Sequence, residues 1–271
     1  MSGSLAERSE PDPRTASGPL LDVSGIKLSF GGIKALDDVS FTVDSGQIVG
    51  LIGPNGAGKT TMFNCLSRVY VPNEGQIRFK GQPILKEPTH RIADIGIGRT
   101  FQNLALFKTM TVLQNVMVGG HCTTASGFIG NALRLPSVRR EEDELVGRAW
   151  SLISYLGLES VAHARVSDLP FGTQKRVEIG RALASKPTLL LMDEPAGGLN
   201  HEEIGGLGDL IRQIRDERDI TVLIVEHHMS LVMAISDKVV ALDFGRKLAE
   251  GTPAEVQKDP EVIRAYLGTN D

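Results

Sequence analysis

Hydrophobic residues occur in short runs near the start of this chain, and turn-forming residues separate these runs. The runs are rich in β-branched and aromatic residues, which is the composition typical of short strands. One helical stretch, beginning near Gly58, interrupts them. We therefore predict a strand-rich segment over residues 20–101, with strands at 20–30, 37–43, 47–53 and 75–81.

In the middle of the chain, residues 102–186, the spacing of the apolar residues is typical of helices. Within 139–158 the apolar positions recur every three or four residues, which places them on one face of a helix. Gly157 follows them and is suited to end that helix. Core packing is the simpler explanation of this stripe, and a partner-binding face is the alternative. The stripe consists of Leu145, Ala149, Leu152, Ile153 and Leu156.

The last segment, residues 187–250, alternates between strand and helix patterns. The runs 188–193 and 221–226 are almost wholly apolar, which is typical of parallel strands that are covered on both faces. Between them, 202–219 has the pattern of a crossover helix, which its glycines weaken. Strands that alternate with helices in this way predict an α/β fold.

Composition and charge narrow the classes of function. The formal net charge is −4 and no block of one sign dominates, which disfavours a nucleic-acid partner. Cys65 and Cys122 lie too far apart for a CxxC motif, and we expect two reduced thiols. No apolar run approaches the ~18 residues that a membrane span requires. Residues 1–19 have no apolar core of a signal peptide and are rich in Ser, Pro and Gly, so we expect a disordered leader.

An apolar run over 48–53 leads directly into the pattern G-x-x-x-x-G-K-T, formed by Gly53, Gly58, Lys59 and Thr60. A strand before the pattern and a helix after it are the context that a phosphate-binding loop requires. The glycines allow backbone N–H groups to turn towards a phosphate, and the helix N-terminus adds its positive dipole end. Lys59 would reach the β- and γ-phosphates of a nucleotide, and the Thr60 hydroxyl would coordinate Mg²⁺.

Two acidic residues stand at the end of the apolar run 188–193, one as its last residue and one directly after it. Asp193 and Glu194 would lie at the carboxyl edge of the sheet, where open α/β folds bind their ligands. Asp193 would hold Mg²⁺, directly or through water, and Glu194 would act as general base for an attacking water. The alternative is a pair of acids that caps the next turn.

Two histidines follow the neighbouring run 221–226. Parallel strands would bring His227 and His228 near the same edge as Glu194, within reach of a γ-phosphate. A purely structural role is the alternative for a histidine at a strand end. We favour His227 for the contact because it directly follows Glu226.

With these motifs, the chain resembles the ATP-binding cassette (ABC) family from about residue 20 to the C-terminus. The stretch 53–61 is similar to the Walker A loop of that family, and 189–195 is similar to its Walker B strand with the catalytic glutamate. Residues 99–107 look like the Q-loop, 197–200 like the D-loop and 226–227 like the switch histidine.

The resemblance implies roles for single residues. Phe30 stands where the family places an aromatic side chain that stacks on adenine. The implied ATP-binding residues are Phe30, Gly53, Pro54, Asn55, Gly56, Ala57, Gly58, Lys59, Thr60 and Thr61. The implied Mg²⁺-binding residues are Thr60, Gln102 and Asp193. The implied catalytic residues are Glu194 and His227.

Residues 169–174 stand where the family has its signature, usually written LSGGQ. In this family two cassettes pair head to tail, and the signature of one closes on the ATP held by the other. The implied signature residues are Leu169, Pro170, Phe171, Gly172, Thr173 and Gln174. Pro170 replaces the serine and Phe171 replaces a glycine, so one hydroxyl donor and one N–H donor are lost.

The family fold is a P-loop NTPase core of the RecA-like kind, with an antiparallel β subdomain and an inserted α-helical subdomain. Applied to this chain, it predicts an ABC ATPase domain over 20–271. Residues 20–101 and 187–271 would form the nucleotide-binding core, and 102–186 would form the helical signature subdomain.

Several stretches indicate which subgroup of the ABC family the chain resembles. Residues 101–121, 131–144, 169–183 and 193–200, together with the ending 259–268, resemble the ATPase subunits of branched-chain amino acid importers. The insert at 131–144 points to the larger of the two such subunits. His228 is a departure, since relatives mostly have Asp there.

The resemblance implies ATP and Mg²⁺ as ligands and several protein partners. These are a second ABC ATPase subunit, identical or different, two transmembrane permease subunits and, indirectly, a substrate-binding protein. The location would be the cytoplasmic face of the plasma membrane. The alternatives are an importer of urea or short amides, a soluble ABC ATPase of translation or DNA repair, and another P-loop enzyme such as a small-molecule kinase.

Overall fold

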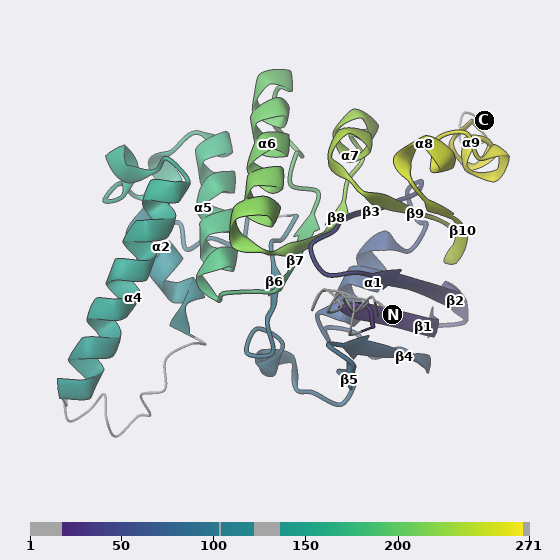
Figure 1. Cartoon of the computed structure of the whole chain (residues 1–271), viewed down its shortest axis with the longest axis horizontal. Coiled ribbons are helices and arrows are strands. Elements are labelled where there is room, and N and C mark those ends of the chain that lie inside the picture. Colours follow the sequence, from purple (N-terminus) through teal and green to yellow (C-terminus); the bar gives the residue numbers. More distant parts are fainter. Residues whose placement is uncertain (1–17, 103, 122–135, 268–271) are drawn as a thin grey trace, which may run out of the picture.

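The structure, a computed structural model, describes residues 18–102, 104–121 and 136–267. Residues 1–17 of the expected leader, Cys122 and residues 131–135 of the insert therefore lie outside the described residues. The strands form two sheets, and a group of helices lies at one end of the molecule (Figure 1).

The smaller sheet is antiparallel, with strand order β2-β1-β4-β5. The predicted strand at 37–43 begins four residues earlier than we expected, at Ile33. The reason is a two-residue turn, in which Gly31 and Gly32 both have positive φ angles and Phe30 pairs directly with Ile33. The strands are β1 (Leu21–Phe30), β2 (Ile33–Val43), β4 (Glu74–Phe79) and β5 (Gln82–Pro83).

The larger sheet has six strands in the order β10-β9-β3-β8-β7-β6. All neighbours are parallel except β9 and β10, which form a hairpin that the sequence analysis did not separate. Val225 pairs with both Leu51 and Asp193, so three central strands end side by side. The strands are β3 (Ile48–Ile52), β6 (Ile97–Arg99), β7 (Leu189–Asp193), β8 (Thr221–Val225), β9 (Lys238–Asp243) and β10 (Arg246–Gly251).

Helix α1 (Lys59–Leu66) joins the two sheets into one core. Its side chains Met62, Phe63 and Leu66 are fully buried, in a cluster that contains residues of β1 and β2 as well as of β3, β7 and β8. The helices α6 (His201–Arg218) and α7 (Met229–Ile235) contribute to a second cluster together with strands β7 and β8. The short helices α8 (Pro253–Val256) and α9 (Pro260–Leu267) pack beside β9 and β10.

The helices α2 (Val112–Gly119), α4 (Pro136–Tyr155) and α5 (Phe171–Ala184) lie together at the end of the molecule away from the smaller sheet (Figure 1). The predicted apolar stripe on α4 is buried among them, so core packing is confirmed and the partner-face alternative is wrong. Gly157 follows the helix with a φ of 65°, as expected of a residue that ends it. In the described ranges, short 3₁₀ turns include η2 (Thr89–Arg91), η4 (Glu159–Val161) and η5 (Val166–Asp168).

Candidate functional site

The loop between β3 and α1 depends on its glycines. Gly53, Gly56 and Gly58 have φ angles of 152°, 82° and 98°. A Cβ atom on Gly53 would lie 2.2 Å from the carbonyl oxygen of Leu242, and one on Gly58 would lie 2.7 Å from that of Ala35. Both the backbone conformation and the lack of space therefore require glycine at these two positions.

Lys59 is the first residue of α1 and is buried in the loop. Its Nζ donates hydrogen bonds to the carbonyl oxygens of Gly53 at 2.6 Å and Pro54 at 2.9 Å. Burial lowers the pKa of the ammonium, and the carboxylates of Glu194 and Asp193 oppose that shift. No side chain caps the N-terminus of α1 among the residues described, so the loop and the helix start suit an anion there.

Asp193, the last residue of β7, forms a buried ion pair with Arg99 at the end of β6. Nη2 of Arg99 lies 2.9 Å from Oδ2, and the two side chains are 9% and 3% exposed. The other carboxylate oxygen, Oδ1, is buried and has no hydrogen-bond partner in the described part of the chain. Burial raises the pKa of this carboxyl, and the hydrogen bond from Arg99 opposes the rise. An orphaned carboxylate oxygen fits an oxygen-seeking cation such as Mg²⁺.

Arg99 also ties Asp193 to α1. Its Nη1 donates to Oδ1 of Asn64 at 2.9 Å and to the Ser67 hydroxyl at 2.5 Å. Its guanidinium lies 5.1 Å from the centre of the Phe101 ring. No local pattern in the sequence marks Arg99 for this role, because only the parallel pairing of β6 with β7 brings it to Asp193.

Glu194 is the centre of a polar cluster at the ends of three chain segments. Its Oε2 accepts a hydrogen bond from Nε2 of Gln102 at 2.7 Å, and its Oε1 lies 2.8 Å from Nε2 of His227. The residue itself has a φ of 47°, an uncommon conformation for glutamate. The structure thus brings three predicted site residues into direct contact.

Glu226 explains why the rings of His227 and His228 have different partners. Its buried carboxylate accepts hydrogen bonds from the backbone N–H groups of Ala196, His227 and His228, at 2.6, 2.8 and 3.1 Å. It also lies 3.2 Å from Nδ1 of His228. The His228 ring is therefore held by Glu226, whereas the His227 ring faces Glu194. The sequence analysis named Glu226 only as a neighbour and missed this role.

Phe30 lies at the end of β1 with 45% of its surface exposed. Its ring meets that of Tyr70 edge to face, with centroids 5.1 Å apart. Tyr70, which the sequence analysis did not propose, lies just after α1 and donates its backbone N–H to the carbonyl of Asn64. The two rings form an exposed aromatic surface near the end of that helix.

The stretch 169–174 forms the start of α5. The helix begins at Phe171, and Pro170 is its N-cap residue. Nε2 of Gln174 donates to the carbonyl of Leu169 at 2.8 Å, which fixes the loop in front of the helix. The ring of Phe171 packs on Gly198, where a Cβ atom would lie 2.9 Å from it.

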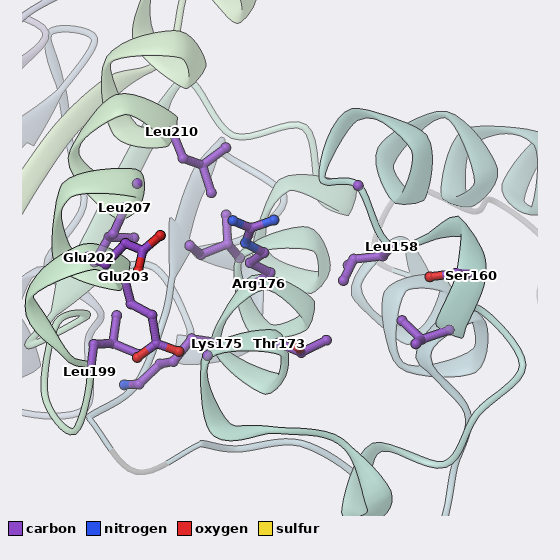
Figure 2. A pocket seen from close by; sticks show the side chains of 15 residues that line it. Leu158, Ser160, Thr173, Lys175, Arg176, Leu199, Glu202, Glu203, Leu207 and Leu210 are labelled. Carbon is purple, nitrogen blue, oxygen red and sulfur yellow. The ribbon is translucent and has the colours of Figure 1, made fainter.

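A cavity of about 590 Å³ lies against the start of α5, between α6 and the segment 157–161 (Figure 2). Its lining includes Gly172 and Thr173 of α5, Glu202 and Glu203 of α6, and Ser160. None of its lining residues belongs to the loop 53–61 or to the cluster around Glu194. In Figure 1, α5 also lies well away from α1, so this chain does not bring its residues 169–174 to its own phosphate loop.

A glycine-dependent loop before a helix, a buried aspartate at the next strand end and a glutamate held by Gln102 and His227 define a P-loop ATPase. Residues 36–197 match the family model described as "ABC transporter", and residues 246–271 match one described as "Branched-chain amino acid ATP-binding cassette transporter". The chain belongs to the ABC transporter family, and it is an ATP-binding protein that hydrolyses ATP to power transport.

Relatives match over nearly the whole chain. The "High-affinity branched-chain amino acid transport ATP-binding protein BraF" of Pseudomonas aeruginosa is 44% identical over 93% of this chain and 99% of its own length. The corresponding protein LivG of Escherichia coli K12 is 43% identical over the same shares. A solved structure described as the ADP conformation of MJ1267, an ATP-binding cassette of an ABC transporter, is 31% identical. It superposes with a TM-score of 0.81 over 93% of this chain and 100% of that one, which confirms the predicted fold class.

No helix in the described ranges is both long enough and apolar enough to cross a membrane.

Proposed function

We propose that this chain is the ATP-hydrolysing subunit of an importer for branched-chain or other hydrophobic amino acids. The similarity to BraF and LivG over 93% of the chain supports this substrate class. The match of residues 246–271 to a branched-chain amino acid family model supports it independently of the ATP site. The single observation that carries the catalytic part is the contact of Glu194 with both Gln102 and His227.

ATP would bind over the loop 53–61, with its adenine against Phe30. Lys59 would exchange its two carbonyl partners for the β- and γ-phosphates, since its ammonium already lies inside the loop. Thr60, Asp193 and Gln102 would hold Mg²⁺, which supplies positive charge against the phosphate oxygens. The orphaned Oδ1 of Asp193 supports this assignment.

Hydrolysis would proceed by attack of a water oxygen on the γ-phosphorus. As that bond forms, the bond between the γ-phosphorus and the bridging oxygen breaks, and ADP leaves with the electron pair. Glu194 would accept the proton of the attacking water, and His227 would orient Glu194 and contact the γ-phosphate. Gln102 would hold the second carboxylate oxygen of Glu194.

Residues 169–174 would act on the ATP of a second ATPase subunit. Their position on α5, apart from the phosphate loop of the same chain, supports an action in trans. The movement of the two ATPase subunits on ATP binding and hydrolysis would pass to two transmembrane permease subunits at the cytoplasmic face of the plasma membrane. A separate binding protein would deliver the amino acid. In this scheme residues 20–101 and 187–271 act as the nucleotide-binding core, and 102–186 act as the helical signature subdomain.

The test is reconstitution of the full chain in proteoliposomes with two permease subunits and a binding protein, which we would seek among the reading frames beside its gene. We expect leucine, isoleucine or valine to stimulate ATP hydrolysis and to accumulate inside the vesicles. The Lys59→Ala variant should lose nucleotide binding in a calorimetric titration, and with it both activities. Stimulation by urea or acetamide instead would overturn the substrate class, and full ATP affinity of Lys59→Ala would overturn the assigned loop.

A further inference from the structure

Glu178 places a carboxylate inside the molecule. It lies on α5, two turns after Phe171, and its surface is only 2% exposed. Its Oε1 accepts hydrogen bonds from the backbone N–H groups of Phe101 at 3.0 Å and Ala105 at 3.5 Å. Burial raises the pKa of this carboxyl, and the hydrogen bond from Phe101 opposes the rise. A buried carboxylate is costly unless it is hydrogen-bonded or paired with a cation, and here the two N–H groups, together with the charges of Lys175 and Arg181, offset the cost of burial.

A second side chain of α5 holds the same segment. Arg181, one turn after Glu178, donates a hydrogen bond to the carbonyl oxygen of Ala105. Both backbone polar groups of Ala105 therefore bind to α5. Lys175, one turn before Glu178, points its ammonium over the Phe171 ring instead, at 5.5 Å from the ring centre.

Gln102 lies between the two residues that α5 holds. Its side chain reaches in the other direction, where Nε2 donates to Oε2 of Glu194 at 2.7 Å. Phe101 and Gln102 are consecutive residues. The hydrogen bond from the Phe101 N–H to Glu178 therefore restricts the backbone position of Gln102 and, with it, the position of the Gln102 Cα atom. A continuous set of contacts thus runs from Glu178 through Gln102 to Glu194.

We infer that Glu178 is a positioning residue, which fixes Gln102 against Glu194 and couples the helix that carries residues 169–174 to the hydrolysis site. The inference rests on the proposed roles of Gln102 and Glu194. Its physical basis is that two backbone N–H contacts to one buried carboxylate, at 3.0 and 3.5 Å, limit the movement of Phe101 and Ala105 relative to α5. A shift of α5 would therefore move Gln102 with it.

The first test is a double-mutant cycle on the reconstituted transporter. Glu178→Ala removes the acceptor, and we expect kcat to fall by about tenfold to a hundredfold, as for a displaced catalytic group, with little change in KM for ATP. Glu178→Gln keeps an oxygen at Oε1, and it should retain most of the activity. In a Gln102→Ala background, Glu178→Ala should lower kcat little further, because its target is already gone. An equal loss in both backgrounds, or no loss in either, would overturn the inference.

Hydrogen exchange on the full chain without nucleotide gives a readout that does not depend on activity. Glu178→Ala should speed exchange at the amides of Phe101 and Ala105, and Glu178→Gln should restore protection. Glu202→Ala serves as a control, since Glu202 is an exposed glutamate on α6. Unchanged exchange in Glu178→Ala contradicts the inference. If the wild-type chain shows no hydrolysis that depends on Glu194, the proposed function fails instead, and the exchange result still decides whether Glu178 holds the segment.

Discussion

Nε2 of His227 lies 2.8 Å from Oε1 of Glu194, although 33 residues separate them in the chain. The parallel pairing of β7 with β8 places Asp193 opposite Val225, so the residues that follow each strand leave the sheet side by side. The His227 side chain is 43% exposed, and that of Glu194 is 19% exposed. The pair therefore lies at the surface of the sheet edge, where a nucleotide phosphate and a water can reach it.

Replacing Glu194 by Gln should separate binding from hydrolysis. The amide keeps the shape of the side chain and loses the base, a role worth about 10²–10⁴ in rate. We expect ATP affinity close to that of the wild type by calorimetry and a fall in kcat of that size. The variant should also accumulate as a dimer on size exclusion with ATP and Mg²⁺. Turnover near the wild-type value would show that the base lies elsewhere, with His227 as the next candidate.

The two adjacent histidines offer a matched pair of variants. His227 faces Glu194, whereas the His228 ring lies against Glu226. We expect His227→Ala to lower kcat strongly and His228→Ala to keep most of it. Steady-state ATPase assays with both variants decide the question. A larger loss in His228→Ala would contradict the assignment of His227.

The buried pair of Arg99 and Asp193 should matter for stability. Arg99→Met leaves a buried carboxylate without its cation, which costs about 3–5 kcal/mol in the free energy of unfolding. Arg212→Met is a suitable control, because its ion pair with Asp209 has the same 2.9 Å distance but is exposed, and such pairs contribute about 0–1 kcal/mol. Urea unfolding at pH 7 measures both. Equal effects of the two substitutions would contradict the prediction.

The same pair predicts a dependence on pH. Burial raises the folded-state pKa of Asp193, and loss of Arg99 should raise it further. A carboxyl whose pKa is raised by folding favours the folded state while it is protonated, and this contribution disappears as the pH rises through the folded pKa. The destabilisation by Arg99→Met should therefore be larger at pH 8 than at pH 5. A larger effect at pH 5 would show that Asp193 is not the group involved.

The signature residues are best tested at Thr173. A carboxylate at Gly172 would meet a carboxylate of the same chain, since a Cβ atom there lies 2.6 Å from Oε1 of Glu203. Thr173→Glu avoids that position and should leave ATP binding of its own chain intact. Its carboxylate would instead repel the γ-phosphate held by the partner cassette, by at least ~1 kcal/mol at contact distance. ATP-driven dimerisation and transport should fail.

Mixing variants separates action in trans from action in cis. If the wild-type chain forms homodimers, a mixed dimer of one Thr173→Glu chain and one Lys59→Ala chain has one site with both lesions and one site with neither, so part of the ATPase activity should return. A mixture that stays inactive, while wild-type chains form active homodimers, means that the trans assignment is wrong or that one dead site stops both. If wild-type chains alone do not dimerise with ATP, the partner is a different ATPase subunit, and the same experiment is repeated with that subunit.

The sequence by itself determined the phosphate loop, because its information is local. The positive φ angles at Gly53, Gly56 and Gly58 depend on the residue type at those positions, and the flanking strand and helix follow from their own periodicity. The apolar runs that became β7 and β8 indicated buried parallel strands for the same reason. Parallel strands in turn imply that Asp193, Glu194 and the two histidines lie at one edge of the sheet.

Only the tertiary structure decided which of these side chains touch. The choice between His227 and His228 depends on Glu226, whose carboxylate turns one ring away from Glu194. Arg99 and Glu178 looked like ordinary charged residues in the sequence, because their partners are 94 and 77 residues away. Contacts of this kind depend on strand order and on how helices pack, and neither has a local signature in the chain. The hydrophobic pattern thus placed the acids and histidines that follow β7 and β8 at one sheet edge, whereas packing decided which of them touch and brought Arg99 to Asp193.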